Sequence, residues 1–133
     1  MRHDTSHHTK TLSLLLDRAK ADPEILAVMV FGSAARGEQG TDSDMDICLV
    51  LMPSRVDQTG FSTKRLDYAQ IGDLDVSIFQ ALPLYIRRRV LKEGRIEFVR
   101  DEDALYEVAY RTAQAYEDFH RHYHDYLNQV ASG

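Results

Sequence analysis

Four residues in the first half of the chain have types and spacing that suit phosphate and metal chemistry. Gly32 and Ser33 directly follow an apolar run, and Asp44 and Asp46 follow them in the pattern G-S-x10-D-x-D. Glycine lets a backbone approach a ligand closely, and the hydroxyl and N–H of a serine at a helix start favour a bound phosphate. Residues two apart in an extended chain point to the same side. Asp44 and Asp46 therefore converge, which favours a hard cation such as Mg²⁺ between them.

A third carboxylate lies further along the chain, in another predicted strand. Asp75 stands between Leu74 and Val76. If this strand neighbours the one that carries Asp46, its side chain joins the other two carboxylates. Three carboxylates beside a phosphate-binding turn are typical of a two-metal site for phosphoryl or nucleotidyl transfer.

Rival interpretations of this segment can be tested on the residues themselves. A Walker A loop requires lysine where Glu38 stands. An EF-hand loop requires glycine at Ile47 and glutamate at Pro53. Glycine, serine and aspartate also occur simply as turn formers between strands. The combination of Gly32-Ser33 after a strand, the Asp pair and Asp75 favours the catalytic interpretation.

Helical and strand patterns alternate along the chain, which predicts a single layered α+β (α/β) domain over residues 1–133. Residues 1–10 are polar and predict a disordered tail. The long segment 103–131 contains no glycine or proline and predicts a C-terminal helix. The other predicted elements are a helix from Thr11 to Asp22, strands at 25–31, 46–51 and 74–79, a short helix within 56–71, a helix from Pro83 to Gly94, and a short edge strand at 96–99.

Composition narrows the class of protein. The chain has 133 residues, 44% of them hydrophobic, and a formal charge of −5, which makes direct nucleic-acid binding unlikely. Cys48 is the single cysteine, so no internal disulfide can form, and a buried strand position is expected for it. No apolar run reaches membrane-spanning length, and the N-terminus lacks a secretory pattern. The expected location is the cytoplasm, with no membrane partner.

The motif from Gly32-Ser33 to Asp44-Met45-Asp46 resembles the signature of the DNA polymerase β-like nucleotidyltransferase superfamily. From Thr11 to Leu127 the chain is similar to the minimal nucleotidyltransferases (MNT), the antitoxins of HEPN–MNT toxin–antitoxin systems. The resemblance implies a small mixed β-sheet flanked by helices, with a long C-terminal helix. It also implies that Asp44, Asp46 and Asp75 bind two Mg²⁺ ions and carry catalysis. Gly32, Ser33, Arg36 and Ser43 match nucleotide-binding positions.

The same resemblance implies an activity and a partner. The expected reaction transfers AMP from ATP to a hydroxyl, that of a tyrosine, on a partner HEPN ribonuclease toxin, and releases pyrophosphate. Two alternatives stay open. One is an antitoxin that neutralises the toxin by binding without catalysis, and the other is a transferase for a small hydroxylated molecule of the aminoglycoside type.

The C-terminal helix carries Tyr106, Tyr110, Tyr116, Tyr123 and Tyr126. Tyrosine is enriched at protein interfaces, but a helical apolar face more often packs on its own core. The sequence favours packing within the domain.

Overall fold

A central sheet of four strands organises the computed structural model, which describes residues 2–32, 45–72 and 74–132, with side chains described from Thr9 to Ala131. The strands are β1 (Ile25–Phe31), β2 (Met45–Leu51), β3 (Leu74–Ile78) and β4 (Arg95–Val99). Their order is β3-β2-β1-β4. The β1–β2 and β1–β4 pairs are antiparallel, whereas β2 and β3 are parallel. The predicted mixed sheet is therefore confirmed.

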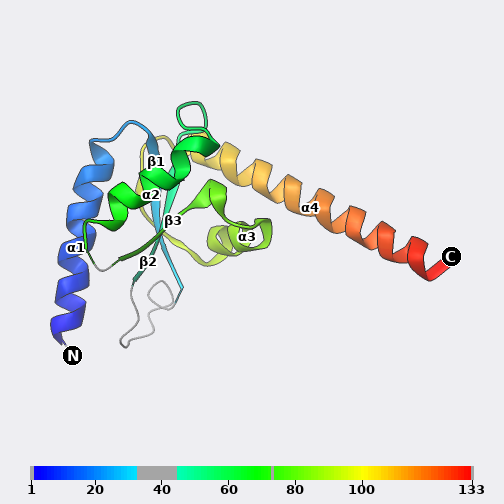
Figure 1. Cartoon of the computed structure of the whole chain (residues 1–133), viewed down its shortest axis with the longest axis horizontal. Coiled ribbons are helices and arrows are strands. Elements are labelled where there is room, and N and C mark those ends of the chain that lie inside the picture. The colour runs from blue at the N-terminus through cyan, green and yellow to red at the C-terminus, as the bar shows by residue number, and fades with distance from the viewer. Residues whose placement is uncertain (1, 33–44, 73, 133) are drawn as a thin grey trace.

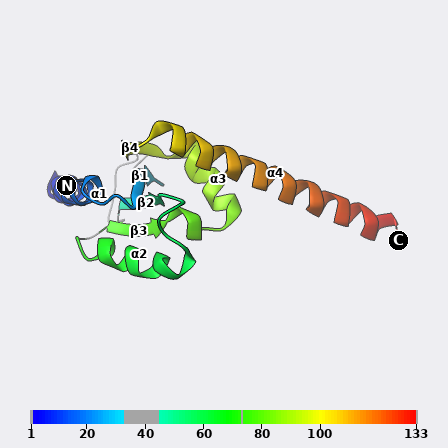
Figure 2. The same cartoon turned by 90° about the horizontal axis from the view of Figure 1, so that it is seen from above.

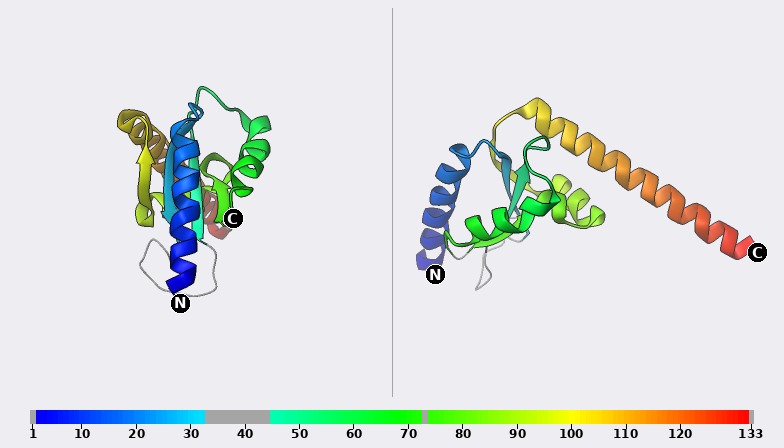
Figure 3. Two further views of the ribbon diagram at one scale, coloured as in Figure 1. Left: turned by 90° about the vertical axis from the view of Figure 1, so that its left-hand side faces the viewer. Right: turned by 45° about the horizontal axis from the view of Figure 1, so that its top comes forward.

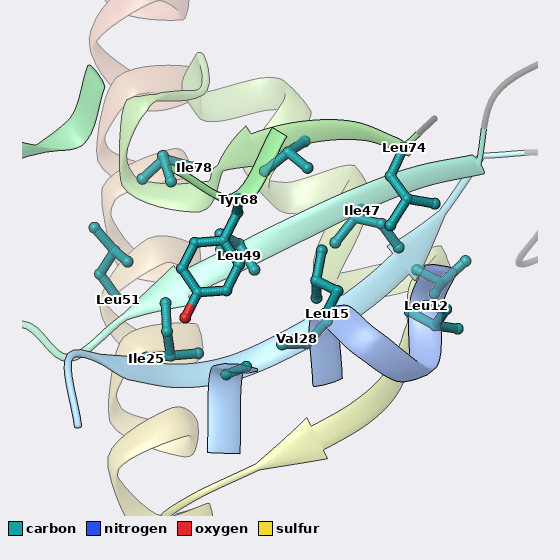
Figure 4. Packing of buried hydrophobic residues seen from close by; sticks show 13 residues of the cluster. Leu12, Leu15, Ile25, Val28, Ile47, Leu49, Leu51, Tyr68, Leu74 and Ile78 are labelled. Atoms are coloured by element: carbon teal, nitrogen blue, oxygen red, sulfur yellow. The ribbon is translucent and has the colours of Figure 1, made fainter. Parts of the chain in front are cut away.

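One face of the sheet is covered by α1 (Arg2–Lys20) and α2 (Phe61–Ala69). Leu15 of α1 and Tyr68 of α2 are buried against alternate residues of the strands, among them Val28 and Leu49. Figure 4 shows these side chains filling the space between the helices and the sheet. Alternate residues of a strand point to opposite faces, so the strand residues between these pack on the other face of the sheet.

The opposite face is covered by α3 (Leu84–Glu93) and by the first part of α4 (Glu102–Ser132). Val90 of α3 and Leu105 and Val108 of α4 pack there against strand residues such as Cys48. Cys48 is fully buried, as predicted, and burial raises the pKa of its thiol to about 12. The two short 3-10 turns, at Gln58–Gly60 and Phe79–Ala81, lead into α2 and out of β3.

The chain is arranged as a layered body with one projecting helix. The sheet lies between the two helical layers (Figure 2), and α4 continues far beyond it (Figure 1). Figure 3 shows that α1 runs along one side of the sheet while the end of α4 lies away from it. Within the described residues, no helix has the length and apolar character needed to cross a membrane.

Most predicted elements coincide with the structure, and the first helix differs. Helix α1 begins at Arg2 rather than at Thr11, so the backbone of 2–10 is helical where the sequence indicated a disordered tail. No glycine or proline precedes Pro23, and polar residues alone do not end a helix. The C-terminal helix, α4, starts one residue before the predicted segment and ends one after it.

Candidate active site

The turn after β1 is built around Gly32. Its φ of 80° lies in the left-handed region, which side chains other than glycine rarely adopt. A Cβ atom at this position would fall directly on the carboxylate of Asp46, whose Oδ2 lies against the Gly32 backbone. Glycine is therefore required here both by the backbone dihedral and by the close approach of a carboxylate.

Asp46 and Asp75 lie side by side on neighbouring strands. In the parallel register of β2 and β3, Asp46 pairs with Asp75, and the next pairs are Ile47 with Val76 and Cys48 with Ser77. Residues paired in this way point to the same face of the sheet. Because Ile47 and Val76 pack on the α1–α2 face, both carboxylates lie on the α3–α4 face.

The environment of the two carboxylates differs from the interior that begins one residue further on. Asp46 is half-buried and Asp75 is exposed, whereas Ile47 and Val76 are buried. The pair thus stands where the core ends and solvent begins, at the end of the sheet beside Gly32. A ligand can reach this position from solvent.

The other predicted site residues cannot be placed. Ser33, Arg36, Ser43 and Asp44 lie outside the described residues. Within the described part of the chain, no three residues of the types His, Cys, Asp and Glu form a group able to hold a metal ion. The structure thus brings together Gly32, Asp46 and Asp75.

A basic residue at this end of the sheet was not singled out by the sequence motifs. Arg95 pairs with Val30 on the edge strand β4, and its Nε lies 2.9 Å from Oε2 of Glu97. Gly94 precedes it, and a Cβ there would clash with the carbonyl oxygen of Val90, which explains the glycine at the end of α3. The tight α3–β4 connection brings Arg95 to this end of the sheet. Its partner Val30 packs on the α1–α2 face, so Arg95 lies on the face opposite Asp46 and Asp75.

The donor chemistry of this site suits a hard divalent cation. Two carboxylates held in register are mutually repulsive in the absence of a positive charge, and carboxylate oxygens are the ligands that Mg²⁺ takes in nucleotide-handling sites. A glycine turn that lets its backbone close on a ligand stands beside them. Such a set is suited to nucleotide binding and transfer.

Comparison with known proteins assigns the family. The family model described as polymerase beta, nucleotidyltransferase, matches residues 15–103. The chain belongs to the polymerase beta nucleotidyltransferase family. The matched segment contains all four strands and every predicted site residue, so the carboxylate pair beside Gly32 lies within the nucleotidyltransferase domain.

A curated relative supports the same assignment. The chain is 31% identical over 103 residues to "Putative protein adenylyltransferase MJ1547" of Methanocaldococcus jannaschii, a match that covers 74% of this chain and 75% of the relative.

Solved structures share the nucleotidyltransferase fold. One chain of a toxin–antitoxin crystal structure with AMP-PNP matches at a TM-score of 0.64 and 20% identity, covering 91% of this chain and 96% of that one. A chain from the structure of tri-AMPylated Shewanella oneidensis HEPN toxin in complex with MNT antitoxin matches at a TM-score of 0.60 and 16% identity, covering 94% and 97%. A nucleotidyltransferase-type chain from Sulfolobus solfataricus matches at 0.51 and 22% identity, covering 68% and 79%. At these identities the likeness concerns the fold.

Proposed function

We propose that this protein is an adenylyltransferase of the MNT type, which transfers AMP from ATP to a hydroxyl on a partner protein. The observation that carries the proposal is the in-register pair of Asp46 and Asp75 beside the Gly32 turn, within a domain of the polymerase beta nucleotidyltransferase family. The name of the Methanocaldococcus relative supports a protein acceptor.

The nucleotide is proposed to bind at the Gly32 turn with its triphosphate toward the carboxylates. The positive φ of Gly32 and the absence of a side chain let the backbone close on the phosphates. Ser33 and Arg36 are proposed to bind the phosphates, with Ser43 as a further nucleotide contact. A bound analogue of ATP in a structure of the same fold supports ATP as the nucleotide.

Asp44, Asp46 and Asp75 are proposed to hold two Mg²⁺ ions. When bound, divalent cations at such a site supply charge stabilisation and lower the pKa of a coordinated hydroxyl. Asp75, the exposed member of the pair, is proposed to stand nearest the acceptor hydroxyl and to help activate it. The acceptor hydroxyl gives up its proton to solvent water as its oxygen forms a bond to the α-phosphorus, the bond from that phosphorus to the bridging oxygen breaks, and pyrophosphate leaves.

The acceptor is proposed to be a tyrosine hydroxyl of a HEPN toxin. Chains of the same fold occur in toxin–antitoxin structures, including one with a tri-AMPylated HEPN toxin. Tyrosine supplies a hydroxyl at the end of a long, rigid side chain, which can reach an exposed carboxylate such as Asp75 from the surface of another protein.

The test is AMP transfer from ATP to a purified HEPN toxin, with Mg²⁺ present and intact mass measured. The wild-type protein is expected to add one or more AMP masses. The Asp46→Asn/Asp75→Asn variant is expected to lose transfer by on the order of 10³-fold, the loss typical of removing charge stabilisation from a transition state.

The matched control is Asp17→Asn, which makes the same chemical change on the exposed surface of α1. It is expected to retain wild-type transfer. Full activity of the Asp46→Asn/Asp75→Asn variant, or transfer that survives complete removal of divalent cations by EDTA, would contradict the proposed site. Toxin neutralisation by a folded but inactive variant would favour neutralisation by binding.

A further inference from the structure

The outer part of α4 does not pack on the core formed by the described residues. Residues 117–131 are all exposed, and Figures 1 and 2 show this part of the helix leaving the sheet and extending into solvent. We refer to residues 117–132 as the arm. At a helical rise of 1.5 Å per residue it is about 24 Å long. The sequence favoured packing of this face on the core, which the structure supports only for the first part of α4.

An apolar stripe runs without interruption from the packed part of α4 into the arm. Its positions alternate at spacings of four and three residues, the heptad pattern of helices that pack side by side along their length. They are Leu105, Ala109, Thr112, Tyr116, Phe119, Tyr123, Tyr126 and Val130. The inner members Leu105 and Thr112 are buried, whereas Phe119, Tyr123, Tyr126 and Val130 are 56–63% exposed. Among the described residues, the inner half of the stripe is therefore packed on the domain and the outer half is exposed.

Aromatic side chains in the exposed half of the stripe contact one another. The rings of Phe119 and Tyr123 stack at a centroid distance of 6.3 Å and an interplanar angle of 8°. The guanidinium of Arg88, on α3, lies 4.6 Å from the ring centre of Tyr116 at the base of the arm. Aromatic side chains give large contact areas at low entropic cost. These contacts hold the base of the arm and present its aromatic side chains together.

We propose that the arm is the docking site for the acceptor protein, which lays an amphipathic helix with its own heptad stripe along residues 116–130. The inference rests on the proposed function and adds to it the surface that recognises the partner. Figure 2 shows α3 lying between the sheet and the arm. A helix on the stripe would lie on the α3–α4 side of the sheet, which is also the side that carries Asp46 and Asp75.

The area of the stripe favours an acceptor protein over a second copy of this chain. With each large side chain of the arm about half exposed, the stripe offers on the order of 500 Å² on one side. That is below the roughly 800 Å² per partner of a standard stable interface. Two arms paired alone would form a weak contact. An acceptor protein, which must also reach the carboxylates, adds the missing area at the active site.

The charge of the arm also favours an acceptor protein over a second copy of this chain. Glu117, Asp118 and Asp125 stand against the single Arg121, a net of −2 with the histidines neutral. Two copies would bring like charge together, on a chain whose own formal charge is −5. A partner helix with basic residues beside its stripe would instead be attracted.

The experiment compares two double variants of the full chain that each change the formal charge by −2. Phe119→Glu/Tyr123→Glu breaks the stripe, and Gln114→Glu/Arg121→Gln alters the opposite, exposed side of the helix. Binding to the purified HEPN toxin and to AMP-PNP is measured by calorimetry, and AMP transfer by intact mass. Helix content is measured by circular dichroism and oligomeric state by sedimentation.

The stripe variant is expected to lose more than about tenfold in binding, as interfaces do when central aromatic residues are removed, and to lose AMP transfer with it. Its AMP-PNP affinity and helix content should stay at wild-type values, and the control variant should bind within about twofold of wild type. Stripe-dependent binding without AMP transfer by the wild-type protein would refute the proposed function and leave the docking surface supported. Undiminished binding by the stripe variant, absence of binding by wild type, or a wild-type dimer that only the stripe variant disrupts would overturn the inference.

Discussion

Acidic residues lie at both ends of the four-stranded sheet, and their neighbours are of opposite kinds. At the end where β1 begins, Oδ2 of Asp22 accepts hydrogen bonds from Lys64 Nζ at 3.0 Å and from the Tyr68 hydroxyl at 2.8 Å. At the end where β1 finishes, Asp46 stands in register with another aspartate, Asp75. At the first end the carboxylate lies beside a lysine, whereas at the second end two aspartates lie next to each other on paired strands.

The first end also ties three elements of the fold together. Arg100, at the end of β4, donates from Nη2 to the carbonyl oxygens of Ala19, Lys20 and Asp22, and from Nε to that of Ile25. These groups end α1 and begin β1, and helix C-termini need such donors because their last carbonyls have no partner within the helix. Gln80 similarly pairs with both backbone groups of Leu51.

The first end of the sheet stabilises the fold, and the second end is the proposed active site. Polar groups at the first end satisfy one another and hold the sheet to its helices. At the second end, a carboxylate lies against the left-handed turn at Gly32 and beside a second aspartate, and two carboxylates in register favour a cationic ligand. Substitutions at the first end should therefore mainly lower stability, and substitutions at the second end should mainly lower activity.

The largest effect on stability is expected from Arg100→Ala. Losing a charged donor to four carbonyl oxygens should lower the free energy of unfolding by about 2–3 kcal/mol, measured by urea denaturation. Arg95→Ala, at the other end, removes an exposed ion pair with Glu97 and should cost less than about 1 kcal/mol. Equal losses in the two variants would remove the contrast between the ends.

A smaller loss is expected from Gly32→Ala, together with loss of AMP transfer. The left-handed backbone should cost about 1–2 kcal/mol, and the new Cβ would displace the Asp46 carboxylate. Gly60→Ala is the control, because the φ of Gly60 is −91°. Its new Cβ would meet Cγ1 of Val56 at 3.0 Å, so its stability should fall by less than about 1 kcal/mol and its AMP transfer should stay at the wild-type value. A stable, fully active Gly32→Ala variant would show that this turn does not require glycine.

The smallest difference is expected from a pH series on Asp22→Asn and Asp75→Asn. Burial acts to raise the pKa of Asp22, but hydrogen bonds from Lys64, the Glu24 N–H and Tyr68 outweigh it, so the pKa lies below its ordinary 3.8. Because the folded pKa is lowered, this carboxylate stabilises the fold fully above about pH 5 and less as the pH falls through the lowered pKa. Asp22→Asn should therefore be less stable than wild type at pH 7, with the gap narrowing below pH 4.

Asp75→Asn provides the contrasting measurement in the same urea series. It removes a like charge from beside Asp46, and like charges directly opposite on paired strands are destabilising. Its stability at pH 7 should equal or slightly exceed that of wild type. A loss as large as that of Asp22→Asn would mean that Asp75 has a structural role.

The sequence by itself determined the order and type of most elements and the family to which the chain belongs. Apolar runs such as 25–31 and stops such as Pro23 and Gly94 act within a few residues, so they can be interpreted locally. The spacing of Gly32-Ser33 and the Asp pair likewise predicted a nucleotidyltransferase motif, and the family match agrees.

Tertiary structure alone decided which distant residues meet. Strand β3 pairs in parallel with β2, and this pairing places Asp75 beside Asp46. The pairing depends on contacts between segments far apart in the chain, which local sequence patterns do not encode. The two parts of α4 teach the same lesson. Its heptad stripe looks uniform in the sequence, because periodicity indicates that a face is apolar but not whether the body is long enough to cover it.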